Sequence, residues 1–498
     1  MSGKGMTRRE FLRGSAGTLL GAAAFSLLGF LSPEKARAAE TAVDVEAGTA
    51  VDAAALMETS VDSTSLSIVR DTSKCIGCGK CVEMCTERQG LDILQLALKN
   101  GKMVSSLKSA ASLSESACIG CGQCARHCPS GAITVKDSLS AVAAALGDSS
   151  YRYIVWQFAP SAQHIIGEEF RELTGTDMSK KLAAAVRKLD SRSLAFSTDF
   201  GADITIMEEA TECVNCFRAG TKKPFMTSCC PGWVNYVELT APDLIPHLSS
   251  CKSPMEMLGS LIKSYLPEQK GVQASELFHV AVMPCTAKKY ERSREEMSTG
   301  GVRSVDAVLT VVEFKNLLMS RGIDLTALAD GEYDSLFAGT SGAGRIFGAT
   351  GGVCEAAMRT AYYLLTNQEP PAIDFTALRG NDGLKTAEVN IGSQTIRACV
   401  VNGIGNIKTI TESIRNGTCP YDFIEVMACR GGCSGGGGTP VLFGDEGVRH
   451  RGLYRYDAAS SLRSSHLNRT LSAIYTDYLT SPCSEIAESL LHTSYHAR

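Results

Sequence analysis

The sequence predicts a protein of mixed architecture, α+β or α/β, in which a small cysteine-rich domain precedes a larger α/β domain and a helical tail. The 498 residues exceed the usual size of one domain. Eight of the 20 cysteines fall in two short runs between residues 75 and 128. From Tyr151 onwards, apolar runs alternate with helical segments, which is typical of α/β domains.

The composition is that of a globular protein with a large core, since 44% of the residues are hydrophobic and 20% are charged. The formal net charge of −4 gives no reason to expect nucleic-acid binding, although a docking site for a small basic redox protein is compatible with it. The clustered spacing of the cysteines favours metal ligation over a framework of disulfides.

The N-terminal segment has the features of an export signal. The sequence TRREFLR (7–13) is a twin-arginine signature, and the apolar run Ser15–Leu31 follows it. Small residues at Ala36 and Ala38 predict cleavage after Ala38. We therefore expect a twin-arginine signal peptide at residues 1–38 and a periplasmic location. An uncleaved membrane anchor is the alternative, but the apolar run is short for a spanning helix.

Residues 39–65 contain no Lys or Arg and are rich in Ala, Val, Thr, Ser and Asp. This composition predicts a flexible linker. The first folded domain is expected at residues 66–140.

The domain at 66–140 carries the spacing C-x2-C-x2-C-x3-C twice. This run is typical of paired [4Fe–4S] clusters, in which the fourth cysteine of each run binds the other cluster. The predicted ligand sets are Cys75, Cys78, Cys81 and Cys128 for one cluster, and Cys118, Cys121, Cys124 and Cys85 for the second. A zinc ribbon is the alternative, but zinc sites rarely use a doubled run of four cysteines. We therefore expect a ferredoxin-like domain with two [4Fe–4S] clusters.

Three further cysteine-bearing segments lie in the α/β domain, which is predicted at residues 150–440. They are TSCCPGW (227–233), MPCTAKK (283–289) and MACRGGCSGGGG (427–438). Buried strands are predicted at Tyr153–Phe158, Phe278–Met283 and Phe423–Met427. The last two strands end two residues before Cys285 and Cys429, and α/β sheets place their sites at such carboxyl ends. A sulfur-rich ligand set selects iron–sulfur or zinc over magnesium or calcium.

These three segments resemble the signature motifs of the [FeFe]-hydrogenases, as do TIMEEATE (205–212), SGAGRIFGATGG (341–352) and DFIEVMAC (422–429). The resemblance covers roughly residues 66–440. It implies a two-lobed catalytic domain with the active site in a cleft. It also implies an H-cluster, which is a [4Fe–4S] cluster joined to a diiron unit with CO, cyanide and azadithiolate ligands.

The resemblance assigns roles residue by residue. The [4Fe–4S] part of the H-cluster would be held by Cys230, Cys285, Cys429 and Cys433, and Cys433 would also bridge to the diiron unit. Lys288 would donate to a cyanide ligand, because a buried ammonium needs a partner. Met283 and Met427 would pack against the diiron unit as soft, apolar neighbours. The pocket would be completed by Ala159, Pro160, Ser161 and Phe347.

Cys229 stands beside a cluster ligand and is not needed to complete the set of four, which favours a catalytic thiol. In the family the matching cysteine passes protons, and the matching relay runs through Glu209 and Ser249 to Glu212 at the surface. Glu209 and Glu212 are three residues apart, so one helical face would present both carboxylates. A buried carboxyl with a raised pKa can give and accept protons near neutral pH. From spacing alone, a solvated helix face is an equal alternative.

Some positions depart from the family pattern. Met255 stands where the family commonly has a glutamine near the diiron pocket. Cys213, Cys216 and Cys251 are additional thiols close to the predicted relay. We expect them to pack as small hydrophobic side chains, with a redox-sensitive or accessory metal pair at Cys213 and Cys216 as the alternative.

The tail at residues 441–498 resembles the separate small subunit of periplasmic [FeFe]-hydrogenases, as though two subunits were fused in one chain. Helices are expected at Ser461–Leu479 and Cys483–Tyr495. An ordinary pair of amphipathic helices is the alternative, and both interpretations place helices on the catalytic core.

The resemblance implies reversible heterolytic cleavage of H2, which export favours in the uptake direction. Electrons would pass through the two [4Fe–4S] clusters to a periplasmic c-type cytochrome or a ferredoxin-like redox protein. H-cluster maturation proteins and the twin-arginine translocase are further expected partners. Two alternatives stay open at this point. One is a hydrogenase-like iron–sulfur assembly or sensor protein without diiron chemistry, and the other is an electron-transfer protein that uses only residues 66–140.

Overall fold

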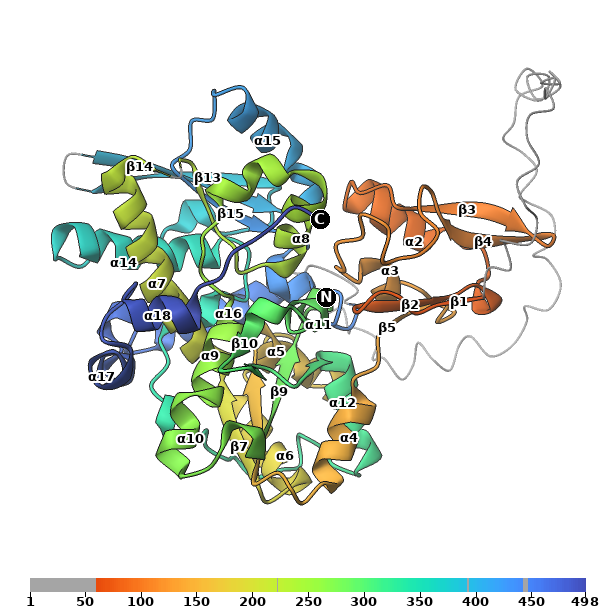
Figure 1. The fold of residues 1–498 in the computed structure, drawn as a ribbon, viewed down its shortest axis with the longest axis horizontal. Helices are drawn as coiled ribbons and strands as arrows, with labels where there is room; N and C mark the ends of the chain where they lie inside the picture. Colours follow the sequence, from red (N-terminus) through yellow and green to blue (C-terminus); the bar gives the residue numbers. More distant parts are fainter. Residues whose placement is uncertain (1–59, 222, 392–393, 442–446) are drawn as a thin grey trace, which may run out of the picture. The chain divides into compact units, whose positions relative to one another are not determined.

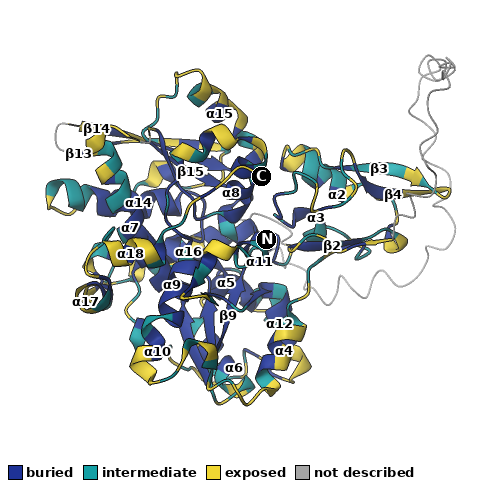
Figure 2. Cartoon of the chain, viewed as in Figure 1, coloured by how far each residue is buried: buried dark blue, intermediate teal, exposed yellow. Residues whose placement is uncertain are grey.

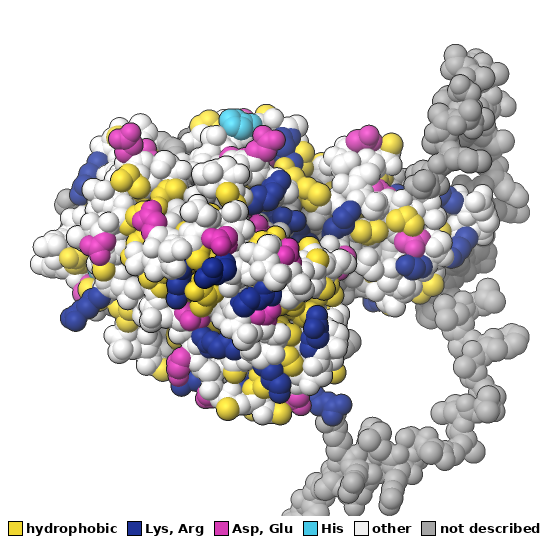
Figure 3. Space-filling model, turned by 60° about the horizontal axis from the view of Figure 1, so that its bottom comes forward, with side chains coloured by type: hydrophobic (Ala, Val, Ile, Leu, Met, Phe, Trp, Pro, Cys, Tyr) yellow, Lys and Arg dark blue, Asp and Glu magenta, His cyan; other side chains and the backbone are white. Residues whose placement is uncertain are grey.

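The structure is a computed structural model that describes residues 60–221, 223–391, 394–441 and 447–498 (Figure 1). The predicted signal peptide at 1–38 and most of the predicted linker lie outside the described residues. Among the described residues, no helix is both long and apolar enough to cross a membrane. Figure 3 shows Lys and Arg side chains interspersed with Asp and Glu over the visible face.

The cysteine-rich domain contains two small sheets and two short helices. One sheet has the antiparallel order β1-β2-β5 and the other is a hairpin of β3 and β4. These elements are β1 (Val61–Asp62), β2 (Ile68–Asp71), β5 (Ile133–Val135), β3 (Leu94–Lys99), β4 (Lys102–Leu107), α2 (Lys80–Glu83) and α3 (Gln123–Arg126). Each helix follows a glycine in the left-handed conformation, Gly79 with φ 74° and Gly122 with φ 68°. Because glycine adopts this conformation without strain, the chain can turn tightly around the cysteines.

The predicted end of the linker at residue 65 is wrong. Residues 61–62 form β1, which pairs with β2. The carboxylate of Asp62 accepts hydrogen bonds from the Thr64 hydroxyl at 2.7 Å and from the Leu113 amide at 2.8 Å. These bonds tie the segment to the domain, and a strand of two residues with one buried position leaves no hydrophobic pattern to detect.

The catalytic domain has two lobes, each built on a four-stranded sheet. The first sheet has the order β12-β9-β6-β7 and is parallel throughout. Its strands are β6 (Tyr153–Phe158), β7 (Ser193–Ser197), β9 (Leu277–Met283) and β12 (Ala307–Thr310). In the second sheet, of order β13-β14-β15-β8, only the hairpin β13-β14 is antiparallel. Its strands are β13 (Leu384–Ile391), β14 (Gln394–Asn402), β15 (Phe423–Met427) and β8 (Phe225–Met226).

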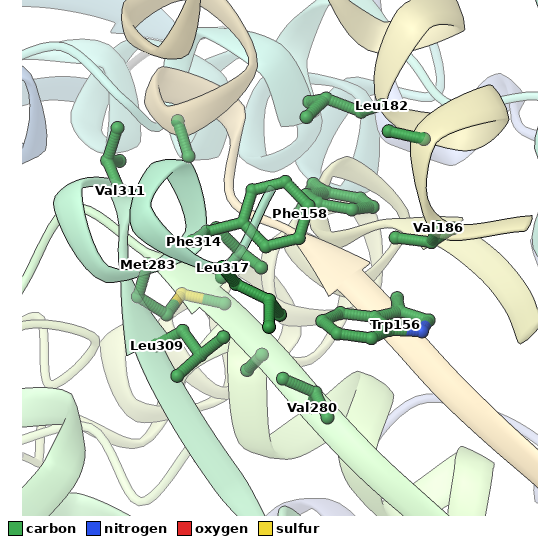
Figure 4. Close-up of a cluster of buried hydrophobic side chains, with 14 of the residues drawn as sticks. Trp156, Phe158, Leu182, Val186, Val280, Met283, Leu309, Val311, Phe314 and Leu317 are labelled. Carbon is green, nitrogen blue, oxygen red and sulfur yellow. The ribbon is translucent and has the colours of Figure 1, made fainter. Parts of the chain in front are cut away.

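The three predicted strands are confirmed, and β9 begins one residue earlier than expected. Their side chains are buried on both faces, which Figure 2 shows as dark strands between partly exposed helices. In the first lobe, Trp156 and Phe158 of β6 pack against Phe314 of α12 (Val311–Ser320), with the rings of Phe158 and Phe314 edge to face at 5.5 Å (Figure 4). The fold class predicted for this domain is therefore confirmed.

The tail is helical but differs from the expectation in its boundaries and its burial. It contains α16 (Gly447–Ala459), α17 (Arg469–Ile474) and α18 (Glu485–Leu491). The single helix predicted over Ser461–Leu479 is wrong, because the Asn468 side chain caps a new helix at Arg469. The tail also packs into the core, since Leu471, Ile474, Leu479 and Leu491 are buried against the catalytic domain.

Candidate active site and metal centres

The strands of both lobes end around one cavity. Because β6 and β9 are parallel, and β15 and β8 are parallel, the loops that follow each pair leave the same edge of their sheet. The loop after β9 carries Cys285, and the loop after β15 carries Cys429 and Cys433. The segment after β8 carries Cys229 and Cys230, just before α8 (Pro231–Thr240). All five cysteines line one cavity of about 70 Å³.

The structure brings the predicted pocket residues to the wall of this cavity. Its lining includes Cys229, Cys230, Cys285, Cys429, Cys433, Lys288, Ala159, Pro160, Ser161, Met283, Phe347 and Met427. Met255, the predicted departure from the family pattern, also lines it, as does Thr198, which sequence reasoning did not select. The wall is therefore apolar apart from its thiols, one ammonium and a few hydroxyls.

Glycines in the third motif let its loop pack closely on the neighbouring segments. A Cβ atom added at Gly436 would lie 2.2 Å from the Pro284 carbonyl oxygen, and one at Gly437 would lie 2.1 Å from that of Cys121. No side chain fits at these two positions. The glycine run in MACRGGCSGGGG therefore places Cys429 and Cys433 against both the second motif and the cysteine-rich domain.

The donor set fits an iron–sulfur centre. Four soft thiols face one cavity, the Ala428 amide donates to Cys230 Sγ at 3.4 Å, and Gln123 Nε2 donates to Cys429 Sγ at 3.3 Å. Burial raises the pKa of the Cys285 thiol to about 12, so a cation is needed to stabilise the thiolate form. The buried Ser161 hydroxyl has no hydrogen-bond partner among the described residues, which also suits a bound group.

Lys288 lies on α11 (Ala287–Glu291) with its ammonium at the cavity. It donates to Glu291 Oε2 at 2.7 Å and to the Cys229 carbonyl at 3.3 Å. Burial alone would lower the pKa of Lys288. The charge and the hydrogen bond of Glu291 act in the opposite direction, and the net effect is a raised pKa. Lys288 therefore stays charged at neutral pH. Sequence reasoning did not select Glu291, although its position three residues after Lys288 was the available signal.

The residues of the predicted proton relay lie on three segments, since Cys229 precedes α8 and Ser249 follows it in the chain. Glu209 and Glu212 share one helix, α7 (Thr198–Ala219), and the Ser249 hydroxyl donates to Glu212 Oε2 at 2.8 Å. Burial, reinforced by the charge of Glu212, raises the pKa of Glu209 to about 8. Burial also raises the pKa of the Cys229 thiol well above its ordinary value, with Glu209 as the next cause. Both groups therefore hold a proton at neutral pH.

The outer end of the relay lies under the tail, which the sequence did not indicate. Glu212, predicted at the surface, is half-buried and also accepts hydrogen bonds from the amide and hydroxyl of Ser250. The Ser250 hydroxyl contacts His492 Nδ1 at 2.8 Å, and His492 Nε2 lies 3.1 Å from Glu208 Oε2. Glu212 is covered because residues 491–493, at the end of α18, pair in antiparallel fashion with residues 250–252.

The additional thiols pack in hydrophobic surroundings. Cys213 and Cys216 lie beside Phe217 and Phe225, and Cys251 is fully buried in the core cluster that includes Met257 and Leu491. Burial raises the pKa of Cys213 and of Cys251. These contacts favour their expected role as small hydrophobic side chains.

In the cysteine-rich domain, the structure supports the crossed assignment of ligands. Cys85 of the first run lines a cavity of about 20 Å³ together with Cys118, Cys121 and Cys124 of the second run. Conversely, Cys128 of the second run packs with Cys75 of the first. Cys81 is buried, whereas Cys78 is exposed.

The cavity lined by the second run adjoins the catalytic domain. Gln123 Nε2 donates both to Cys429 Sγ and to the Gly435 carbonyl, the latter at 2.8 Å. The Thr286 hydroxyl donates to the Gly120 carbonyl at 2.6 Å. Ligand loops of the two domains therefore touch directly, which suits electron transfer between their clusters.

Comparison with known proteins agrees with this geometry. The family model described as the iron only hydrogenase large subunit, C-terminal domain, matches residues 152–437. This chain belongs to the iron-only hydrogenases. The 4Fe-4S dicluster domain matches residues 74–132, and the iron hydrogenase small subunit matches residues 447–498. The predicted resemblance is confirmed, including the small-subunit region in the same chain as the large one.

Individual relatives cover most of this hydrogenase. The NADP-reducing hydrogenase subunit HndD of Solidesulfovibrio fructosivorans is 39% identical over 445 residues, or 87% of this chain and 75% of the relative. The periplasmic [Fe] hydrogenase large subunit of Nitratidesulfovibrio vulgaris is 42% identical over 288 residues, or 57% of this chain and 68% of the relative. A solved structure of the [FeFe]-hydrogenase HydA1 from Chlamydomonas reinhardtii is 36% identical, with a TM-score of 0.65, and covers 72% of this chain and 98% of its own.

Iron–sulfur assembly proteins, the alternative function class, are more distant relatives of this chain. The cytosolic iron-sulfur assembly component 3 of Pongo abelii is 32% identical over 366 residues, or 70% of this chain and 75% of the relative. Both the identity and the share of this chain are lower than for HndD. The chain is therefore an oxidoreductase that acts on H2, with iron–sulfur clusters and an H-cluster as its cofactors.

Proposed function

We propose that this hydrogenase oxidises H2 in the periplasm and sends the electrons through two [4Fe–4S] clusters to an external redox protein. The observation that carries the catalytic part is the single cavity in which four cysteines, Cys229 and Lys288 meet. When bound there, the H-cluster supplies an iron site for H2 and an amine that accepts a proton.

The residues of the cavity hold and shield that cofactor. Its [4Fe–4S] part would be bound by Cys230, Cys285, Cys429 and Cys433, and Cys433 would also bridge to the diiron unit. Lys288 is fixed by Glu291, and its ammonium would act as a charge-assisted donor to a cyanide ligand of the bound cofactor. Water is excluded by the side chains of Met283, Met427, Phe347, Ala159, Pro160 and Ser161, which strengthens each electrostatic contact inside.

Protons leave through the relay that begins at Cys229. Its thiol holds a proton at the cavity wall, where it would serve the amine of the bound cofactor, and the Glu209 carboxyl would be its next partner. Because the pKa of Glu209 is about 8, its carboxyl can donate or accept a proton near neutral pH at low cost. Ser249 would then pass the proton between Glu209 and Glu212, to whose Oε2 its hydroxyl donates at 2.8 Å.

Electrons leave through the cysteine-rich domain. We assign one cluster to Cys118, Cys121, Cys124 and Cys85, next to the H-cluster, and the other to Cys75, Cys78, Cys81 and Cys128. Because Cys78 is exposed, the cluster that includes Cys78 would be the exit. The physiological partner would be a periplasmic c-type cytochrome or a ferredoxin-like redox protein.

The twin-arginine signature and the small-subunit region in one chain support export of the folded, cofactor-loaded protein. The translocase and the H-cluster maturation proteins are then necessary partners. Uptake is favoured because protons released from H2 outside the cytoplasm add to the proton gradient. Film voltammetry tests the direction of catalysis. We expect H2 oxidation currents at least as large as the proton-reduction currents. Proton reduction with negligible H2 oxidation would contradict uptake.

Infrared spectroscopy tests the proposed cofactor. The protein matured with the diiron unit should show CO and cyanide stretches, and Lys288→Ala should shift or weaken the cyanide bands. A matched variant, Lys289→Ala, removes a buried ammonium that contacts Glu313 and does not line the cavity. Equal spectral changes in both variants would remove Lys288 from the cofactor site.

A further inference from the structure

The tail brings a histidine to the outer end of the proposed relay. His492 directly follows α18, which Figure 1 shows next to α7. The main chain on both sides of this histidine is bound to the catalytic domain. The Lys252 amide donates to the Leu491 carbonyl at 2.8 Å, and the Thr493 amide donates to the Ser250 carbonyl at 2.7 Å. The backbone therefore fixes where the imidazole ring lies.

Both nitrogens of this ring meet an oxygen atom. Nδ1 lies 2.8 Å from the Ser250 hydroxyl, and Nε2 lies 3.1 Å from Glu208 Oε2. Glu208 is fully buried, and its carboxyl oxygens also accept from the Tyr475 hydroxyl at 2.5 Å and from the Cys483 amide at 2.7 Å. Tyr475 and Cys483 belong to the tail as well, so the tail surrounds this carboxyl group with donors.

On the other side of Ser250 stands Glu212, the outer carboxylate of the relay. The Ser250 hydroxyl donates to Glu212 Oε1 at 2.9 Å, and the Ser249 hydroxyl donates to Oε2 at 2.8 Å. A serine hydroxyl has one hydrogen, so while that of Ser250 points to Glu212, its oxygen can only accept from the Nδ1–H of His492. The imidazole therefore sets the direction of the hydrogen bond that holds Glu212.

The charges around the ring favour the same arrangement. Glu208 and Glu212 are four residues apart on α7, so they lie on one face of the helix, where two carboxylates repel each other. Only a charged imidazole has two N–H donors. An imidazolium at His492 therefore satisfies the contacts to Ser250 and Glu208 at once and offsets the repulsion between the two carboxylates.

We propose that His492 is a positioning residue of the proton relay, which holds the Glu212 carboxylate through Ser250 where Ser249 can exchange a proton with it. This inference rests on the relay of the proposed function. A glutamate side chain has many rotamers, and without a second anchor Oε2 can turn away from the Ser249 hydroxyl. The small-subunit region at 447–498 then takes part in proton transfer as well as in packing.

The test compares the turnover of the mature, cofactor-loaded enzyme with H2 and a viologen dye, which needs no protein partner. His492→Ala should lower turnover about tenfold, because a displaced carboxylate slows proton transfer. The ratio of turnover in H2O to that in D2O should rise, since proton transfer then limits the rate. Iron content and the infrared bands of the cofactor should stay near those of the wild type. A crystal structure of the variant should show that Ser249 has lost its hydrogen bond to Glu212 Oε2.

Two further variants separate positioning from a general effect on the tail. Asparagine keeps an N–H donor near the place of Nδ1, so His492→Asn should retain at least about half of the wild-type turnover. His496→Ala removes an exposed histidine of the same tail, whose ring contacts the Ser494 hydroxyl, and should change turnover less than about twofold.

A double-mutant cycle tests whether His492 acts through Ser250. Ser250→Ala alone should also lower turnover about tenfold, because it removes the hydroxyl that holds Glu212. Adding His492→Ala to this variant should then lower turnover by less than a further factor of about two. Independent roles of the two side chains would instead multiply to a loss of about a hundredfold.

Several results would overturn the proposal. They are wild-type turnover or an unchanged isotope ratio in His492→Ala, an equal loss in His492→Asn or in His496→Ala, multiplied losses in the cycle, and a Glu212 side chain that keeps its contact with Ser249 in the crystal structure. Glu212→Ala distinguishes this failure from failure of the relay, because its turnover should fall at least about a hundredfold if the relay operates. Turnover near the wild-type value in Glu212→Ala would refute the relay itself, and the role of His492 with it.

Discussion

At the scale of single residues, burial and neighbouring charges set the protonation states of three side chains of the proposed site. Lys288 is an ammonium because Glu291 pairs with it. Glu209 and Cys229 are neutral because burial disfavours their anions. The sequence identified these three residues through the family motifs, but Glu291 and His492 became visible only in the structure. His492 could not be predicted because its partner Ser250 lies 242 residues away in the sequence.

Replacing the relay thiol should separate catalysis from cofactor binding. We expect Cys229→Ala to lower turnover at least about a hundredfold, because it removes the protonated thiol that we propose as the first member of the relay. Iron content and infrared bands should stay near those of the wild type. The control Cys399→Ala removes a buried thiol of β14 away from the cavity and should keep turnover within about twofold. Wild-type turnover in Cys229→Ala would contradict the relay.

The raised pKa of Glu209 should be visible in the pH dependence of stability. Folding raises this pKa from 4.5 to about 8, so between these values the folded chain holds a proton that the unfolded chain has lost. The free energy of unfolding therefore falls as pH rises through this window and levels off above it, by at most about 1.4 kcal/mol per pH unit. Between pH 6 and 8, the free energy of unfolding of Glu209→Gln should fall by about 1–3 kcal/mol less than that of the wild type. Denaturant unfolding at each pH measures this difference. Parallel curves for the two proteins would show that Glu209 is ionised throughout.

At the scale of elements, the strands that position the ligands were predictable and several other elements were not. The runs of β6, β9 and β15 are buried on both faces, so each is a continuous apolar segment. By contrast, α16 buries Arg449, His450 and Asp457, so no apolar stripe marks it as a helix. The end of the linker was also misplaced, because the carboxylate of Asp62 fixes β1 through hydrogen bonds rather than hydrophobic contacts.

A buried ion pair joins α16 to α14 (Gly352–Thr366). Arg359 and Asp457 are fully buried, with Arg359 Nη2 2.9 Å from Asp457 Oδ2. We expect Asp457→Asn to reduce the free energy of unfolding by about 3 kcal/mol, because it leaves buried positive charge less compensated. The exposed pair of Lys408 and Glu412 provides the control, and Lys408→Ala should change stability by less than about 0.5 kcal/mol. Similar losses in both variants would show that the buried pair does not hold the tail.

Close packing at Gly437 should be needed for contact between the two domains. A Cβ atom there would collide with the Cys121 carbonyl, so Gly437→Ala should destabilise the protein by about 1–3 kcal/mol. It should also slow carrier reduction more than H2/D2 exchange, because it separates the ligand loops on the electron path. Gly147→Ala, where a Cβ atom meets nothing within 4 Å, is the matched control. Equal effects on exchange and on carrier reduction would argue against this path.

At the scale of the whole molecule, one chain joins regions that match a dicluster domain, a large subunit and a small subunit. The structure explains why the tail belongs with the catalytic domain, since its apolar residues complete the core around Leu261 and Phe337. The motifs sufficed to predict the family and the two lobes, and the cysteines that they contain line one cavity. They could not predict that the tail covers the outer end of the relay, because this depends on packing between distant segments.

Export should depend on the two N-terminal arginines. We expect Arg8→Lys/Arg9→Lys to leave active enzyme in the cytoplasm, because a twin-arginine signal is recognised by its receptor through the arginine pair. Cell fractionation with an activity assay measures this, and Lys4→Arg serves as a control that leaves the signature intact. Periplasmic activity from the double variant would contradict the proposed route.

An anomalous-scattering map at the iron edge, recorded from crystals of the fully loaded protein, tests the central claim most directly. We expect iron density in the cavity between Cys230, Cys285, Cys429 and Cys433, continuous with a diiron unit at Cys433, and two further iron sites within the cysteine-rich domain. Density confined to the cysteine-rich domain, with none among these four thiols, would contradict it.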